Sequence, residues 1–205
     1  MLLSHSADLS DDDRRGMLEQ ILHDAERVLG LVDELLDASR LETGRLHVVP
    51  RPIDLDELAK NVVAKLKGLY PALDPEIGLA ELPRVMADPA RVEQVFLNLL
   101  GNACKHAEAK GVRIIGRRAG GEVSITIYDG GPGIPRQDLP HVTEKFWKND
   151  DGQLGGLGLG LWISAQIVAA HGGQLSVRPG PGEGVAVSFT IPVHGGPQAA
   201  KLKRP

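Results

Sequence analysis

The sequence predicts an α+β fold, a two-layer α/β sandwich in which helices cover one face of a mixed, largely antiparallel sheet, preceded by a long bundle helix. Two pairs of strand-like segments are each separated by a short, glycine-containing turn, as in β-hairpins. Helical segments lie around these pairs without the regular period of a parallel β-α-β sheet. A long helical repeat of apolar residues comes before them.

The composition is that of a soluble globular protein. Of 205 residues, 42% are apolar and 24% are charged, and the net charge of −4 gives no reason to expect a nucleic-acid partner. The single cysteine, Cys104, excludes a disulfide within the chain. No apolar run approaches the roughly 20 residues that span a bilayer. We therefore expect a cytoplasmic location, although a longer parent protein can be membrane-anchored.

The first helix is predicted to begin at Ser10 or Asp11 and to end near Leu41. A lone helix cannot bury its wide apolar stripe, so residues 11–41 are expected to form a homodimer or heterodimer contact. The stripe contains Leu18, Ile21, Ala25, Val28, Val32 and Leu35, widened by Leu22, Leu29 and Leu36. The acids on the other faces are interpreted as solvated surface, namely Asp24, Glu26, Asp33 and Asp37.

Helices and strands are predicted to follow one another in the rest of the chain. The expected helices are Asp54–Tyr70, Asp88–His106 and Leu159–Ala170. The expected strands are Ile77–Leu82, Val112–Arg118, Glu122–Tyr128, Gln174–Arg178 and Val185–Ile191. The predicted parts of the chain are residues 1–46 for the first helix, 47–193 for the sandwich and 194–205 for a disordered tail.

Asn98, Asn102 and Lys105 are spaced four and then three residues apart, so they share one helix face. Two amides and an ammonium group in a row can hold a hydrated Mg²⁺ and an adjacent polyphosphate. A polar outer stripe on a surface helix is the alternative interpretation.

Two glycine-rich segments suggest contacts with a ligand. Asp129 ends a predicted strand and is followed by Gly-Gly-Pro-Gly, where bare backbone lets a flat ligand approach, although a tight turn explains the same residues. Glycines then alternate over Gly156–Gly160 directly before a helix, whose N-terminus favours phosphate; a flexible loop is the alternative. Neither segment is a P-loop or a Rossmann fingerprint.

The order and spacing of these segments resemble the histidine kinase branch of the ATPase superfamily that includes gyrase, Hsp90 and the MutL proteins. Residues 88–105 resemble that family's N box, 129–134 its G1 box, 144–147 the F box of its ATP lid and 156–161 its G2 box. The resemblance covers about residues 11–193. Residues 170–173 add a weaker similarity to the sensor kinases of bacterial potassium uptake.

The resemblance implies that the ligands are ATP and Mg²⁺. It also implies that residues 1–46 are a partial dimerisation and phosphotransfer helix, and that residues 47–193 are an ATP-binding catalytic domain. It implies that Asn102, supported by Asn98, holds Mg²⁺, that Lys105 contacts the phosphates, and that all three are catalytic. Asp129 would accept a hydrogen bond from the adenine amino group. The remaining implied nucleotide contacts are His106, Gly131, Gly133, Ile134, Phe146, Gly156, Leu157, Gly158, Leu159 and Gly160.

Some residues depart from the family pattern. Asn98 stands where the ATP-hydrolysing relatives have Glu, and an amide cannot act as a general base, so transfer to a protein acceptor is favoured over hydrolysis. His106 stands where an aromatic residue is commoner, and Thr143 replaces the first Phe of the F box. The polar stretch 148–154 is predicted to be a mobile part of the lid.

We identify no phosphoacceptor histidine, because neither His5 nor His23 has the flanking residues of the family's phosphorylated motif. The expected partners are therefore a phosphoacceptor histidine domain, supplied in trans or by an upstream segment, and a response regulator. A related serine kinase of the anti-sigma type or an ATPase, and a nucleotide-gated interaction module without catalysis, remain as alternatives.

Overall fold

The computed structural model describes residues 10–42, 46–148 and 157–193, except for some side chains in the first helix. Helix α1 is Asp11–Glu42, α2 is Leu55–Lys67, α3 is Pro89–Ala107 and α4 is Gly160–Ala170. The strands are β1 (Arg51–Ile53), β2 (Glu76–Gly78), β3 (Val85–Ala87), β4 (Arg113–Ala119), β5 (Glu122–Tyr128), β6 (Leu175–Pro179) and β7 (Val185–Pro192).

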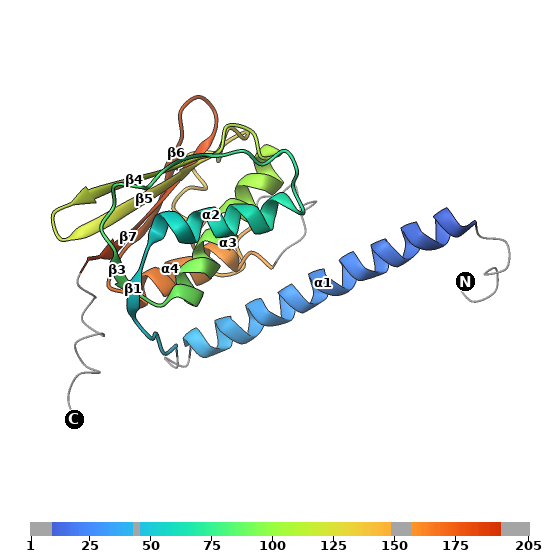
Figure 1. Cartoon of the computed structure of the whole chain (residues 1–205), viewed down its shortest axis with the longest axis horizontal. Coiled ribbons are helices and arrows are strands. Elements are labelled where there is room, and N and C mark those ends of the chain that lie inside the picture. Colours follow the sequence, from blue (N-terminus) through green and yellow to red (C-terminus); the bar gives the residue numbers. More distant parts are fainter. Residues whose placement is uncertain (1–9, 43–45, 149–156, 194–205) are drawn as a thin grey trace.

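Five strands form the main sheet in the order β2-β4-β5-β7-β6. The pairing of β2 with β4 is parallel and the other pairings are antiparallel, so the sheet is mixed as predicted. Helices α2, α3 and α4 cover one of its faces (Figure 1). The predicted long helix before the sandwich is present as α1, and it extends away from this body.

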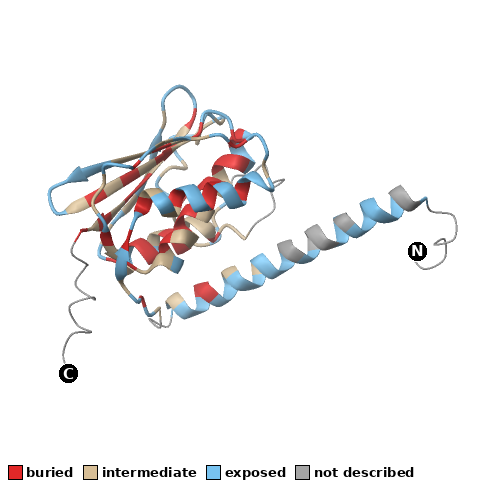
Figure 2. Ribbon diagram, viewed as in Figure 1, coloured by how far each residue is buried: buried red, intermediate tan, exposed pale blue. Residues whose placement is uncertain are grey.

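The core lies between the sheet and the three helices, where the buried residues gather (Figure 2). Residues of β5 alternate between this core and the outer face, and the inward ones are Val123, Ile125 and Ile127. Phe189 of β7 pairs with Ile125 across the strands and meets Phe96 of α3 edge to face, with ring centroids 5.5 Å apart. The aromatic pair therefore joins α3 to the middle of the sheet.

Strands β1 and β3 form a small antiparallel sheet that the sequence did not predict. Pro52 lies in the middle of β1, and a proline normally indicates a break in a strand because it lacks an N–H donor. A two-stranded ribbon has only edge strands, where the missing donor is tolerated. The prediction of a strand over residues 77–82 was wrong beyond Gly78, because the chain turns there, with the Leu82 N–H donating to the Leu79 carbonyl.

Asp88 and His171 join four segments of the fold. Asp88 caps α3, because its Oδ1 accepts from the N–H groups of Ala90 and Arg91, and its Oδ2 accepts from Val49 at 2.9 Å. His171 is buried at the end of α4, where its Nε2 accepts from the Asp88 N–H at 2.9 Å and its Nδ1–H donates to the Ile167 carbonyl at 2.8 Å. The ring must therefore be neutral, since its Nε2 has to accept.

Helix α1 begins as the sequence predicted. Ser10 Oγ accepts from the Asp13 N–H at 3.1 Å, and the Asp13 carboxylate accepts in return from the Ser10 N–H at 3.2 Å, which is a reciprocal N-terminal cap. Much of the apolar stripe is exposed: Leu18, Ile21, Val28, Leu29, Val32, Leu35 and Leu36. Among the described residues, no helix is long and apolar enough to cross a membrane. The predicted disordered tail lies outside the described residues.

We predict that acid destabilises the fold through His171. Burial lowers the pKa of His171 below its ordinary value, against the charge of Asp88, so protonation favours the unfolded chain. Stability from this group is complete above the unfolded pKa of about 6.5 and is lost as the pH falls toward the folded pKa, by up to about 1.4 kcal/mol per pH unit. Urea unfolding followed between about pH 7.5 and 5 should show this loss. The His171→Gln variant should lose less unfolding free energy over the same pH range, because the group that titrates is gone. Equal pH dependence in both proteins would contradict the assignment.

Candidate functional site

The N box and the G2 box lie side by side because α3 packs against α4 (Figure 1). Near the start of α4, the Asn98 side-chain amide donates to the Gly160 carbonyl oxygen and to Ser164 Oγ, both at 3.3 Å. Ser164 is buried, so this part of the contact is shielded from water. The structure therefore brings together two segments that are about 60 residues apart in the sequence.

The polar residues of the N box are not equivalent. The amide nitrogen of Asn98 is occupied by α4, so Asn98 serves to hold the two helices together in this conformation. Asn102 is half-buried one turn further along α3, and Lys105 is exposed a further turn on. The predicted common face is present, but only Asn102 and Lys105 are left without a side-chain hydrogen bond among the described residues.

Asp129 lies just after β5, and the structure fixes its carboxylate. Oδ1 accepts from the Gly131 N–H at 2.9 Å and from the Val185 N–H at 3.3 Å. Its own N–H donates to the Val185 carbonyl at 3.0 Å. Within the described part of the chain, Oδ2 has no hydrogen-bond partner, so it remains able to accept from a ligand.

Glycines let the backbone close tightly around Asp129. A Cβ built on Gly184 would overlap the Asp129 carbonyl oxygen, and one on Gly133 would overlap the Glu183 carbonyl oxygen. Gly133 also has a φ of 78°, in the left-handed region. A Cβ on Gly131 would stand 3.0 Å from the Asp129 carboxylate and 3.2 Å from the Ala107 side chain. The G1 box is thus a close-packed wall between the end of α3 and the β6–β7 hairpin, rather than an ordinary loose turn.

The F box and the G2 box are in direct backbone contact. The Phe146 N–H donates to the Gly158 carbonyl at 3.1 Å, and Phe146 itself has an unusual φ of 66°. Gly158 has a φ of 71°, and a Cβ there would overlap the Trp147 carbonyl oxygen and stand 2.9 Å from the Phe146 carbonyl carbon. The Phe146 side chain is exposed, and Lys145 lies over both its ring and that of Trp162.

The other residues predicted to contact the nucleotide differ in how far they are buried. Leu159 is fully buried in the core, so only its backbone is left for a nucleotide. Ile134 and Leu157 are half-buried, and Gly156 lies outside the described residues, as does most of the predicted lid stretch 148–154. Burial and the adjacent Lys105 lower the pKa of His106, against the charge of Asp129, which favours a neutral ring beside the site.

Sequence reasoning missed the contacts that α1 makes beside this site. Asp37, interpreted as solvated, is buried: Arg91 Nη1 donates to its two oxygens at 3.1 and 3.2 Å, and Gln94 Nε2 donates to it at 2.7 Å. That interpretation was wrong because the last turns of α1 dock onto α3 and α4. Glu42 pairs with Lys145 of the F box. A charged residue outside the apolar stripe gives no local sign that it will be buried, so a periodicity argument could not reveal this contact.

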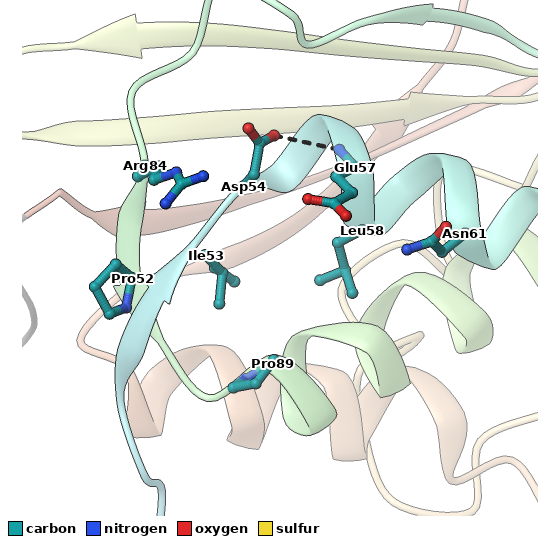
Figure 3. A pocket seen from close by; sticks show the side chains of 8 residues that line it. All are labelled: Pro52, Ile53, Asp54, Glu57, Leu58, Asn61, Arg84 and Pro89. Atoms are coloured by element: carbon teal, nitrogen blue, oxygen red, sulfur yellow. Dashed lines mark hydrogen bonds between the residues drawn. The ribbon is translucent and has the colours of Figure 1, made fainter.

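A separate hollow of about 230 Å³ lies where β1 leads into α2 (Figure 3). Both apolar and polar side chains line it, the polar ones being Asp54, Glu57, Asn61 and Arg84, and it contains none of the predicted site residues. We therefore do not assign it to the candidate site.

We predict that Gly158→Ala lowers the free energy of unfolding by about 1–3 kcal/mol, because Gly158 combines a left-handed φ with a backbone contact that leaves no room for a Cβ. Gly121→Ala is the matched control, because nothing lies within 4 Å of a Cβ at that turn position. It should change stability by less than about 0.5 kcal/mol. Urea unfolding followed by tryptophan fluorescence measures both, and similar values for the two variants would contradict the prediction.

Comparison with known proteins supports the resemblance. A family model described as "Histidine kinase-, DNA gyrase B-, and HSP90-like ATPase" matches residues 87–195, more than half of the chain. The sensor histidine kinase MtrB of Mycobacterium tuberculosis is 34% identical over 202 residues, covering 94% of this chain and 35% of MtrB. The "Non-motile and phage-resistance protein" of Caulobacter vibrioides is 32% identical over 196 residues, covering 90% of this chain and 23% of that protein.

Solved structures agree. Full-length ShkA in complex with AMPPNP superimposes with a TM-score of 0.76 and 28% identity, covering 92% of this chain and 40% of ShkA. The mycobacterial sensor histidine kinase MprB gives a TM-score of 0.63 and 28% identity, covering 72% of this chain and 99% of that structure. The chain spans about a quarter to a third of the length of the two curated relatives. It belongs to the family of histidine kinase-, DNA gyrase B- and HSP90-like ATPases, in the branch of the sensor histidine kinase catalytic domains.

Proposed function

We propose that this chain is the catalytic module of a two-component sensor kinase that transfers the γ-phosphoryl group of Mg-ATP to a histidine on another segment or chain. The observation that carries the proposal is that Asn98 of the N box meets the G2 box, while Gly131 of the G1 box lies close to Ala107 at the end of the same helix. The sensor histidine kinases among its relatives, and the solved complex of ShkA with the ATP analogue AMPPNP, support the same function.

Asp129 is the proposed adenine-recognising residue. Two backbone N–H groups hold Oδ1 and thereby orient the carboxylate, while Oδ2 is left as an acceptor for an exocyclic amino group. The glycines of the G1 box bring bare backbone beside it, which suits a flat base. Recognition by an oriented acceptor favours a 6-aminopurine over a base that carries a carbonyl group at the same place.

Asn102 and Lys105 are the proposed metal and phosphate residues. An amide oxygen is a suitable ligand for Mg²⁺, and an exposed ammonium group can pair with phosphate oxygens. The metal would neutralise charge on the phosphates when bound. The amide nitrogen of Asn98 is engaged with α4, so we propose that Asn98 positions the G2 box, while its side-chain oxygen supports Asn102 at the metal.

Phosphoryl transfer requires positioning and charge neutralisation more than covalent chemistry by the enzyme. An acceptor imidazole nitrogen bonds to the γ-phosphorus while the bond from that phosphorus to the bridging oxygen breaks, and ADP leaves. Asn98 is an amide, so it cannot activate water as a general base, which favours a protein acceptor over hydrolysis. A response regulator would receive the phosphoryl group next, in the cytoplasm.

The exposed apolar stripe of α1 supports a helical partner. Large side chains on that stripe, such as Leu18 at 67% and Leu29 at 64% exposure, are unfavourable in water. We propose that a second chain covers the stripe, giving a homodimer or a heterodimer through residues 11–41.

The direct test is to mix the chain with Mg-ATP and a separate histidine-bearing helical domain from a sensor kinase. We expect a phosphorylated acceptor whose label is lost in acid and kept in base, as for phosphohistidine. The control is the same acceptor with its histidine replaced by glutamine, which should remain unlabelled. Binding of ATP without transfer to any acceptor would instead favour a nucleotide-gated interaction module.

A second prediction tests the adenine assignment. Asp129→Asn should keep the hydrogen bonds from Gly131 and Val185, because the amide oxygen can replace Oδ1, but it replaces the free acceptor with a donor. ATP binding should weaken by about 10- to 100-fold, since a hydrogen bond to a charged group contributes about 1.5–3 kcal/mol. Calorimetry should show unchanged affinity for inorganic triphosphate, and an equal loss for both ligands would contradict the assignment.

A further inference from the structure

Ser164 is a polar side chain on the buried side of α4, where its neighbours are apolar. It is 0% exposed, and the other buried residues of this helix are Ile163, Ile167 and Val168. A buried hydroxyl group is unfavourable unless it is hydrogen-bonded. The side-chain partner of Ser164 is the amide of Asn98 in the N box, at 3.3 Å. This contact joins a residue outside the predicted site to one inside it.

The Asn98 amide can lie against α4 in only one orientation. Its nitrogen donates to the Gly160 carbonyl oxygen and to Ser164 Oγ, both at 3.3 Å. A carbonyl oxygen can only accept, so the nitrogen and not the oxygen of the amide must face Gly160. The amide nitrogen carries two N–H groups, and the two acceptors are enough for both. Oδ1 is left at the other end of the amide, without a hydrogen-bond partner among the described residues.

Both acceptors are needed to hold the amide in this orientation. The last side-chain torsion of asparagine is broad, so a single hydrogen bond leaves the plane of the amide poorly defined. With the Gly160 carbonyl alone, the second N–H would lie against the buried side of α4 without a partner. A turn of the amide that exposes this N–H to water would relieve that cost. The Ser164 hydroxyl removes the cost and keeps the amide in place.

The orientation of Asn98 matters because Asn102 lies one turn further along the same face of α3. An amide oxygen can bind Mg²⁺ or accept from the water molecules that Mg²⁺ keeps, whereas an amide nitrogen can only donate. The end of the Asn98 amide that is free therefore decides whether this residue can support a metal at Asn102.

We propose that Ser164 is a positioning residue of the metal site: together with the Gly160 carbonyl, it holds the Asn98 amide so that Oδ1 is presented to the Mg²⁺ that accompanies ATP. The inference rests on the proposed function, which assigns the metal to Asn102 with Asn98 beside it. Ser164 has no exposed surface, so it cannot touch the nucleotide and acts through Asn98. The Gly160 carbonyl cannot donate, so the same contact favours an amide over a carboxylate at position 98.

The test compares the affinity for ATP in the presence of Mg²⁺ and in the presence of EDTA, by calorimetry on the full chain. Ser164→Ala removes one acceptor and leaves the amide held by the Gly160 carbonyl alone. Mg-ATP binding should weaken by about 3- to 10-fold, which corresponds to the loss of one neutral hydrogen bond. Binding of metal-free ATP should change by less than about twofold, because the proposed role of Asn98 is toward the metal.

Two further variants separate positioning from a general loss of stability. In an Asn98→Ala background, Ser164→Ala should change the Mg-ATP affinity by less than about twofold, because Ser164 then has no amide to hold. Ser188→Ala is the matched control, since Ser188 is also buried and hydrogen-bonded, to Thr126 at 2.9 Å, but lies on the outer face of the sheet. It should leave both affinities unchanged.

Circular dichroism checks that each variant is folded. If Ser164→Ala does not fold, Ser164→Cys decides in its place, because a thiol is a much weaker acceptor than a hydroxyl group and should cause the same selective loss of Mg-ATP binding.

The outcomes separate this inference from the proposed function. If the chain binds Mg-ATP and Ser164→Ala leaves that affinity within about twofold, the positioning role is overturned and the kinase assignment stands. Equal losses with and without Mg²⁺, or the same loss in the Asn98→Ala background, also overturn it, because Ser164 would then act on the fold in general. If the unaltered chain does not bind ATP, or binds it equally well without Mg²⁺, the proposed function fails at that point and this inference fails with it.

Discussion

The antiparallel packing of α3 on α4 is the contact on which the site depends. Hydrogen bonds join the two helices at both ends of α4: His171 at its end accepts from the N–H of Asp88 at the start of α3, and Asn98 in the middle of α3 donates to Gly160 at its start. Each polar group is buried or half-buried, so leaving one without its partner would cost about 1–3 kcal/mol. The register of the two helices is therefore fixed, and with it the position of the N box relative to the G2 box.

Around this helix pair, the G1 and G2 boxes are shaped by close contacts between one backbone segment and another. Gly184 lies against the Asp129 carbonyl, and Gly158 lies against the F box. Such contacts leave no room for a side chain, which explains why these positions are glycine. The close approach has a functional consequence, because the carboxylate of Asp129 is oriented by backbone donors and needs no side-chain partner.

Helix α1 combines two chemistries on two faces. Its apolar stripe is exposed and suits a helical partner, whereas Asp37 and Ala38, near its end, are buried against the catalytic domain. The last turns of α1 are held on α3 by the hydrogen bonds to Asp37, and the stripe further along the helix stays exposed.

The sequence by itself determined the elements and the chemical identity of the site. Alternating apolar residues marked β5, the Asp88-Pro89 start marked α3, and the spacing of glycines and of Asn98, Asn102 and Lys105 indicated the ATPase family, because these signals are local along the chain. The tertiary structure alone decided that Asn98 joins α3 to α4, that Leu159 is a core residue, and that Asp37 and Glu34 turn inward. Those outcomes depend on which surfaces meet across more than 50 residues of sequence, and a charged side chain carries no local sign of whether it will face water or a buried cation.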